Sequence, residues 1–223
     1  MRPQQRPLKC AAMRTVLVSL LALMLVGPAH VAAAEVEAAR QPIEALYGVL
    51  VDCMKNADEL GLEGRRAKIA PAVATSYDLP FMAQKILGRH WKTLDEASQK
   101  RWVETFGGLT SATSAERMTG YTGQVFEVLK VEPSQRGTAL VYSQVVTPGE
   151  APIALNYRMR PDGESWRIID VYLNGTVSEL ALRRSEYAAV LQRDGFEKLV
   201  ASIDEKIAAG QIADETVPAS AAE

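Results

Sequence analysis

The sequence predicts an α+β protein, in which helices pack on a four-stranded antiparallel sheet. Two patterns in the chain of 223 residues indicate this fold. In residues 35–120 and 176–208, apolar side chains recur every three or four positions, as they do on one face of a helix. Residues 124–173 instead contain short β-branched and aromatic runs separated by turn sequences. Strands with such short connections pair mainly as an antiparallel meander.

The first expected helix has an apolar face made of Ile43, Leu46, Tyr47, Leu50, Val51 and Met54. The segment NADELGLEG follows, and its two glycines are expected to end this helix. A second helix is expected around SYDLPFMAQKILG, with Asp78 as its cap and Gly88 at its end.

Two capping boxes mark later helices. Thr93 and Glu96 form the first, and the helix after it is expected to continue, weakened by Gly and Thr, through GGLTSATSAERMTGYTG. Four strands are then expected at QVFEVLKVE, TALVYSQVV, PIALNYRMR and WRIIDVYL. Thr176 and Glu179 form the second box, and Asp194 is expected to cap the final helix.

The last predicted strand is apolar on both faces. Alternation along WRIIDVYL places Ile169 and Val171 on one face, and Ile168 and Tyr172 on the other. One face can cover a core. Either helices cover the second face as well, or that face lines a cavity for an apolar ligand.

Residues 1–34 have the order of a secretory signal peptide. A basic stretch precedes the apolar run TVLVSLLALMLVG, and Ala32-Ala33-Ala34 fits a cleavage site. We therefore expect an exported, periplasmic protein with a folded domain over 35–208 and a flexible tail over 209–223.

Composition excludes several kinds of function. Four of the 25 basic residues and none of the 27 acidic residues lie in the first 34, which leaves a net charge of about −6 and no sign of nucleic-acid binding. After residue 34 the sequence contains one cysteine, Cys53, and one histidine, His90. Neither an internal disulfide nor a Cys/His metal site is therefore expected. Cys53 is expected to be a small buried apolar residue.

Asp170 is the best candidate for enzyme chemistry. A carboxylate on an apolar strand, near tyrosines of neighbouring strands, could transfer protons on a sterol-like lipid. Alternatively, it pairs with Arg158 or Arg160, or is satisfied by Thr176 and the helix start after Gly175. The serine-hydrolase motifs are absent from the sequence.

Two segments carry a family resemblance. Residues 77–106 read YDLPFMAQKILGRHWKTLDEASQKRWVETF, and residues 166–203 read WRIIDVYLNGTVSELALRRSEYAAVLQRDGFEKLVASI. Both resemble the MlaC, or toluene-tolerance, family, and the second is similar to its hopanoid-biosynthesis-associated HpnM branch. The family usually has a tyrosine near the end of the third helix, where this chain has Thr113 and Ser114, so the shape of that end of the pocket is open.

The resemblance implies a soluble periplasmic lipid carrier with an NTF2-like cone and an added helical subdomain. Such a carrier shuttles phospholipid, or a hopanoid-type lipid, between an inner-membrane ABC transporter complex and an outer-membrane lipoprotein–porin complex. It needs no cofactor or catalytic residue, since the lipid is its cargo. Two alternatives stay open: an NTF2-like isomerase or hydrolase that uses Asp170, and a helical adaptor without a ligand.

If the chain is such a lipid carrier, the second apolar face of the sheet lines a tunnel that holds the lipid. The residues expected to line it are apolar side chains on elements that already have another apolar face: Phe81, Met82, Ile86, Phe106, Phe126, Val128, Tyr142, Leu155, Ile169 and Val171.

Overall fold

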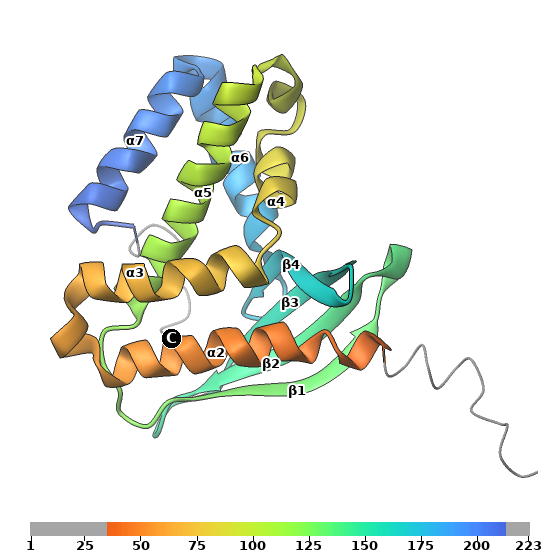
Figure 1. Ribbon diagram of the computed structural model, residues 1–223, viewed down its shortest axis with the longest axis vertical. Coiled ribbons are helices and arrows are strands. Elements are labelled where there is room, and N and C mark those ends of the chain that lie inside the picture. Colours follow the sequence, from red (N-terminus) through yellow and green to blue (C-terminus); the bar gives the residue numbers. More distant parts are fainter. Residues whose placement is uncertain (1–34, 213–223) are drawn as a thin grey trace, which may run out of the picture.

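The computed structural model describes residues 35–212, and Figure 1 shows a sheet with one helix along it and a helical part to one side. The helices are α2 (Arg40–Lys55), α3 (Ala57–Ser76), α4 (Leu79–Leu87), α5 (Glu96–Arg117), α6 (Glu179–Asp194) and α7 (Phe196–Ala209), with short 3-10 turns η1 (Gly88–Thr93) and η2 (Gln135–Gly137). The strands are β1 (Val125–Pro133), β2 (Ala139–Val146), β3 (Ile153–Asp162), β4 (Ser165–Leu173) and β5 (Val177–Ser178).

The sheet confirms the α+β prediction and adds one strand to it. The strands lie in the order β1-β2-β3-β4-β5, and each pairs antiparallel with its neighbours. β5 is a pair of residues whose partners are Tyr172 and Leu173 of β4. It arises because the tight turn after β4 folds the chain back for two residues before α6 begins.

The prediction that the side chains of β4 alternate strictly between the two faces of the sheet is wrong, because the strand contains a bulge. Arg158 of β3 lies opposite Asp170, whereas the next residue, Met159, lies opposite Ile168. Ile169 therefore has no partner in the ladder, and the alternation changes phase there. Trp166, Ile168 and Val171 share the face toward α2, and Asp170 shares the other with Tyr172. The bulge and the packing of α6 on β4 explain why the strand reads as apolar on both faces.

α2 ends at Lys55, directly before NADELGLEG as expected, but Asn56 and not a glycine follows its last residue. Both glycines lie inside α3, which continues to Ser76. The helix bends at Gly61, where φ is 58° and ψ is −176°. Glycine adopts this backbone conformation without the steric cost that a Cβ would bring, so it allows a kink here rather than a stop.

The predicted caps are partly confirmed. The Asp78 carboxylate accepts the Phe81 N–H at 3.1 Å at the start of α4, and Gly88 follows its last residue, as expected. The two capping boxes are wrong, because Asp95 and Ser178 cap α5 and α6 in place of the two threonines. In both cases a good capping side chain stands closer to the first helical residue. Gly195, and not Asp194, is the N-cap of α7.

The core joins the sheet to the helices. α2 lies along one face of the sheet, α3 packs on α2 and α5, and α6 packs on α4, α7 and β4 (Figure 1). Trp102 of α5 is fully buried and donates its indole N–H to the Ala83 carbonyl at 3.0 Å. Cys53 is fully buried in this core, as predicted.

The predicted signal peptide at 1–34 lies outside the described residues, as does most of the predicted tail. Of residues 209–212, which are described, Ile212 is buried and its N–H donates to Glu116 Oε2 at 2.8 Å. Between residues 35 and 212, no helix combines the length and the apolar character that a membrane crossing requires.

Candidate functional site

An apolar groove of about 380 Å³ runs between α2 and β1. Its walls come from one face of α2, from the segment before β1 and from the start of β1: Glu44, Tyr47, Gly48, Val51, Tyr121, Gln124, Val125, Phe126 and Val128. Tyr47 and Phe126 pack against each other across it, with ring centroids 4.9 Å apart. The volume is within the range of about 300–1,000 Å³ that is usual for ligand pockets.

A chain of hydroxyl groups anchors α2 to the sheet beneath this groove. The Tyr47 hydroxyl lies 2.6 Å from Ser143 Oγ, and Ser143 Oγ donates to the Leu155 carbonyl. Burial raises the pKa of the Tyr47 hydroxyl, partly offset by its bonds to Ser143 and Tyr157. Each hydroxyl has a partner, as buried polar groups require, so the chain fixes where α2 sits over β2 and β3.

A second, more polar pocket of about 380 Å³ adjoins the groove. It is formed where α2 passes into α3, and it is lined by Met54, Lys55, Asn56, Ala57, Asp58, Glu59, Gly120 and Tyr121. Tyr121 lines both spaces, and its side chain is 40% exposed. On α2, Val51 of the groove and Lys55 of the pocket are one helical turn apart. The two spaces are therefore neighbours on one continuous surface.

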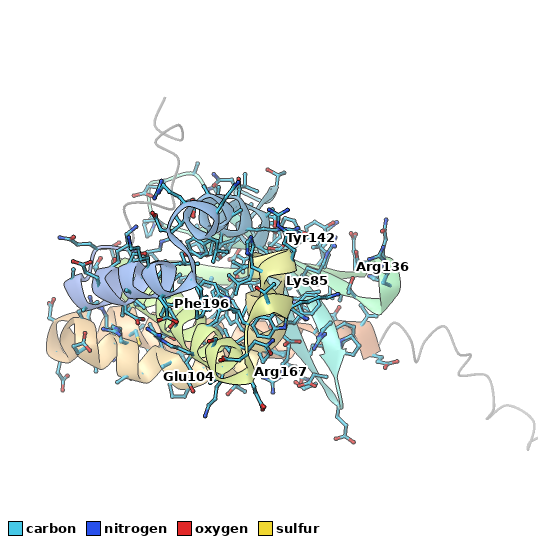
Figure 2. The ribbon with its side chains drawn as sticks, turned by 90° about the horizontal axis from the view of Figure 1, so that it is seen from above. Lys85, Glu104, Arg136, Tyr142, Arg167 and Phe196 are labelled. Carbon is cyan, nitrogen blue, oxygen red and sulfur yellow. The ribbon has the colours of Figure 1, made fainter. Side chains whose placement is uncertain are left out.

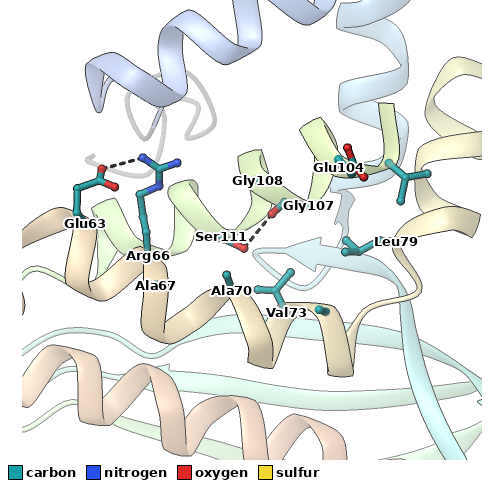
Figure 3. A pocket seen from close by; sticks show the side chains of 12 residues that line it. Glu63, Arg66, Ala67, Ala70, Val73, Leu79, Glu104, Gly107, Gly108 and Ser111 are labelled. Atoms are coloured by element: carbon teal, nitrogen blue, oxygen red, sulfur yellow. Dashed lines mark hydrogen bonds and ion pairs between the residues drawn. The ribbon is translucent and has the colours of Figure 1, made fainter. Parts of the chain in front are cut away.

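A third hollow of about 530 Å³ lies between α3 and α5 (Figure 3). Small residues such as Ala67, Ala70, Gly107 and Gly108 form much of its wall. Its rim carries charge, because Arg66 pairs with Glu63 at 2.8 Å. It is the largest of the three spaces, its apolar side chains are alanines, valines and one leucine rather than aromatic rings, and none of the ten predicted residues lines it.

The structure does not gather the ten predicted residues in one place. Phe126 and Val128 line the groove between α2 and β1. Leu155 packs partly buried against the core, on the same face of the sheet as Tyr157. Ile169 lies at the bulge of β4 and Val171 faces α2; both are buried.

The remaining five lie among the helices or on the other face of the sheet. Met82 and Ile86 of α4 and Phe106 of α5 are buried in the core. Phe81 is partly buried, and its ring lies 4.8 Å from the Arg160 guanidinium and 5.1 Å from Lys85 Nζ. Tyr142 (labelled in Figure 2) alternates with Ser143, so it points away from α2. Lys130 Nζ lies 4.3 Å from the centre of its ring.

Asp170 is satisfied by the start of α6 and by its own strand. Its carboxylate accepts the Val171 N–H at 2.9 Å, the Ser178 hydroxyl at 2.7 Å and the Leu180 N–H at 3.2 Å. The second of the two expected arrangements is therefore the observed one, with Ser178 in place of Thr176. Arg160 pairs with Asp78 instead, and Arg158 lies 5.8 Å from the Tyr172 ring.

Burial raises the pKa of the Asp170 carboxyl, and its three hydrogen bonds partly offset the rise. All three hydrogen bonds come from structural groups at a strand and a helix start, which assigns the carboxylate to holding β4 against α6. This arrangement leaves little of the carboxylate for a substrate.

Several residues of the groove were not predicted from the sequence. Tyr47 and Val51 belong to the apolar stripe of α2, where a side chain that lines a groove and one that fills a core look alike. Gly48 and Tyr121 carry no periodic signal. A tyrosine beside two glycines, in the segment GYTG, indicates a turn rather than a wall of a pocket.

Comparison with solved structures assigns the fold. The chain is similar to a phospholipid-binding protein from Ralstonia solanacearum, whose structure was determined in complex with a phospholipid. The TM-score is 0.67 with 21% identity, over 77% of this chain and 98% of the other. The two chains share a fold, in which a sheet and helices form one domain.

The family model described as "MlaC protein" matches residues 45–205, so this chain belongs to the MlaC family. A curated relative is the intermembrane phospholipid transport system binding protein MlaC of Haemophilus influenzae, which is 23% identical over 132 residues. That match spans 57% of this chain and 61% of the length of the relative.

Proposed function

We propose that this protein is a periplasmic phospholipid carrier, and that the groove between α2 and β1 is where acyl chains enter. The observation that carries the proposal is an apolar groove whose wall includes Tyr47, a residue of the core, and Phe126 and Val128, which pack against that core. Family membership supports it, as does a neighbour of the same fold that was determined with a phospholipid. A hopanoid-type lipid is the alternative cargo within the same proposal.

The hydrophobic effect is strong enough to keep a lipid bound while the protein crosses an aqueous compartment. Each CH₂ group removed from water contributes about 0.8 kcal/mol. Two long acyl chains would contribute about 20–25 kcal/mol, which is near the ceiling of non-covalent affinity. Release into water would be very slow, whereas transfer into another apolar environment costs little. Carriage therefore requires no catalytic residue and no cofactor.

The groove as it stands offers less apolar surface than two acyl chains need. The additional surface would come from side chains beneath α2, such as Leu155 and Val171, which are now covered. We therefore propose that α2 moves away from the sheet when lipid enters. This motion breaks the contact between the Tyr47 and Ser143 hydroxyls, and the hydrogen bond of 2.8 Å that the Arg40 guanidinium donates to the Val128 carbonyl.

Because release into water is slow, the carrier would need a docking partner at the inner membrane and another at the outer membrane. We propose an inner-membrane ABC transporter complex and an outer-membrane lipoprotein–porin complex as these partners. The signal peptide proposed for residues 1–34 would bring the chain to the periplasm, where both are accessible.

Organic extraction of the purified protein, followed by mass spectrometry, tests the proposal. A carrier yields lipid in roughly equal molar amount with the protein. Gly48 lines the groove, and no atom lies within 4 Å of a Cβ placed at this position, so Gly48→Leu directs a side chain into the groove. It should lower the lipid content several-fold. Ala45→Leu, at an exposed position of α2 outside the groove, is the matched control. Lipid-free wild-type protein, or equal lipid in both variants, would contradict the proposal.

Photo-crosslinkers locate the lipid independently of its amount. Probes at Phe126 and Val128 should capture labelled lipid, whereas probes at the exposed Lys100 and Glu150 should not. Equal labelling at all four positions would show that the groove is not the binding site.

A further inference from the structure

The polar pocket beside the groove has charged and amide groups that suit the polar half of an amphipathic ligand. The groove supplies apolar walls, and the adjoining pocket carries an amine, two carboxylates and an amide on the same stretch of chain. Figure 1 shows the segment between α5 and β1 passing the turn between α2 and α3, and this crossing brings Tyr121 to the boundary of the two spaces. A phospholipid with its chains in the groove would have its headgroup at this boundary.

The charged side chains of the pocket are available to a ligand. Lys55 Nζ lies 5.0 Å from the centre of the Tyr121 ring, which is a cation–π distance. Within residues 35–212, neither Lys55 nor Asp58 or Glu59 forms an ion pair with another side chain. The neighbouring Asp52, in contrast, is already paired with Lys68.

The charges of the side chains that line the pocket favour some headgroups over others. Lys55 contributes one positive charge, and Asp58 and Glu59 contribute two negative charges. A phosphate can approach Lys55, but a headgroup with a net negative charge also meets the two carboxylates. A headgroup that bears an ammonium beyond its phosphate meets both signs favourably.

We infer that this pocket, lined by Lys55, Asp58, Glu59 and Tyr121, is a headgroup subsite for zwitterionic phospholipids, with the phosphate at Lys55 and the ammonium at the carboxylates. The inference rests on the proposed carrier function. Because the side chains are exposed, each contact is modest, and the preference over an anionic lipid of equal chain length should be about two- to fivefold.

Competition between two headgroups tests the subsite. The purified protein is incubated with vesicles of equal phosphatidylethanolamine and phosphatidylglycerol that carry the same acyl chains, and the bound lipids are counted by mass spectrometry. The wild type should take up phosphatidylethanolamine in about two- to fivefold excess. The double variant Asp58→Asn/Glu59→Gln should lose this excess while total uptake persists. Lys55→Gln should lower uptake of both lipids, because both contain the phosphate.

Matched charge changes away from the pocket provide the control. On α5, Lys100→Gln removes one positive charge and Glu104→Gln one negative charge from exposed positions outside the subsite, and each should leave the lipid ratio unchanged. Equal uptake of both lipids by the wild type would overturn the headgroup inference while the carrier proposal stands. The same holds if the Asp58/Glu59 variant keeps the preference. No uptake of either lipid, together with no lipid in the organic extract of the purified wild type, would overturn both.

Discussion

Asp170 lies where β4 meets α6, and its partners explain a carboxylate on an apolar strand. Two backbone N–H groups and the Ser178 hydroxyl surround it. The sequence predicted that a buried carboxylate needs partners and named the helix start as one source. It could not choose between that source and the arginines of β3, because the bulge at Ile169 decides which way Asp170 points.

Replacing Asp170 should cost stability without abolishing lipid binding. Asp170→Asn keeps the shape and should lower the free energy of unfolding by about 1 kcal/mol, whereas Asp170→Ala, which leaves buried donors unpaired, should lower it by about 1–3 kcal/mol. Denaturant unfolding measures both, and lipid extraction should still recover cargo. A lipid-modifying activity that Asp170→Asn abolishes at unchanged stability would instead support an enzyme.

The same carboxyl gives a pH dependence of known sign. Burial raises its pKa in the native state, so the native state binds more protons than the unfolded chain once the pH exceeds about 4. Its contribution to stability therefore falls as the pH rises from that value through the raised native pKa. The stability difference between wild type and Asp170→Asn should be larger at pH 4 than at pH 7. A difference that grows with pH would contradict this assignment.

The hydroxyl chain predicts a coupling between Tyr47 and Ser143. Ser143→Ala removes the partner of both Tyr47 and the Leu155 carbonyl, and should cost about 1–3 kcal/mol. Tyr47→Phe should cost about 1 kcal/mol. Unfolding of the double variant should show less than the sum of the two losses, since one shared bond is counted twice. Strict additivity would mean that the two hydroxyls do not interact.

At the scale of elements, the periods of apolar residues located most helices and strands, and the boundaries depended on local chemistry. Asp95 and Ser178 each stand directly before the helix and cap it, whereas the four-residue capping-box pattern places the cap two residues earlier, at Thr93 and Thr176. The glycines of NADELGLEG predict a helix end, because the sequence alone does not distinguish a glycine that ends a helix from one that kinks it, as Gly61 does.

Substitution of Gly61 and of Gly48 by alanine should distinguish the effect of backbone strain on stability from the effect of helix propensity. Neither Gly61 nor Gly48 has an atom within 4 Å of an added Cβ, but only Gly61 has a positive φ, of 58°. Gly61→Ala should therefore destabilise the protein by about 1–3 kcal/mol. Gly48→Ala, inside α2, should stabilise it by about 0.5–1 kcal/mol. Thermal unfolding of the two variants should shift in opposite directions, and equal shifts would argue against a strained kink.

At the scale of the whole molecule, the architecture follows from the sequence more readily than the walls of the proposed groove do. The order of helices, meander and helices predicted the α+β fold. The ten residues predicted to line the lipid tunnel are apolar side chains on elements with two apolar faces, and of these ten Phe126 and Val128 lie at the groove. The lining depends on sheet twist, on the bulge and on where the loop carrying Tyr121 crosses α2, and none of these has a periodic signal in the sequence.

The proposed export concerns the whole chain and can be tested directly. Cleavage after Ala34 should remove the basic and apolar start of the sequence, including Cys10. Intact-mass measurement of periplasmic material should find a chain that begins at Glu35. A full-length chain recovered from the membrane fraction would contradict both the cleavage and the periplasmic location.

The bulge at Ile169 makes β4 one residue longer than its ladder requires. Since Ile168 and Asp170 both have partners in β3, a chain lacking residue 169 could keep every other pairing of the strand and the same faces. Its cost would be the lost burial of one isoleucine, about 1.5–3 kcal/mol. Family members could therefore differ in length by one residue at this point and still build the same core. Aligning them by alternation alone would assign half of the strand to the wrong face.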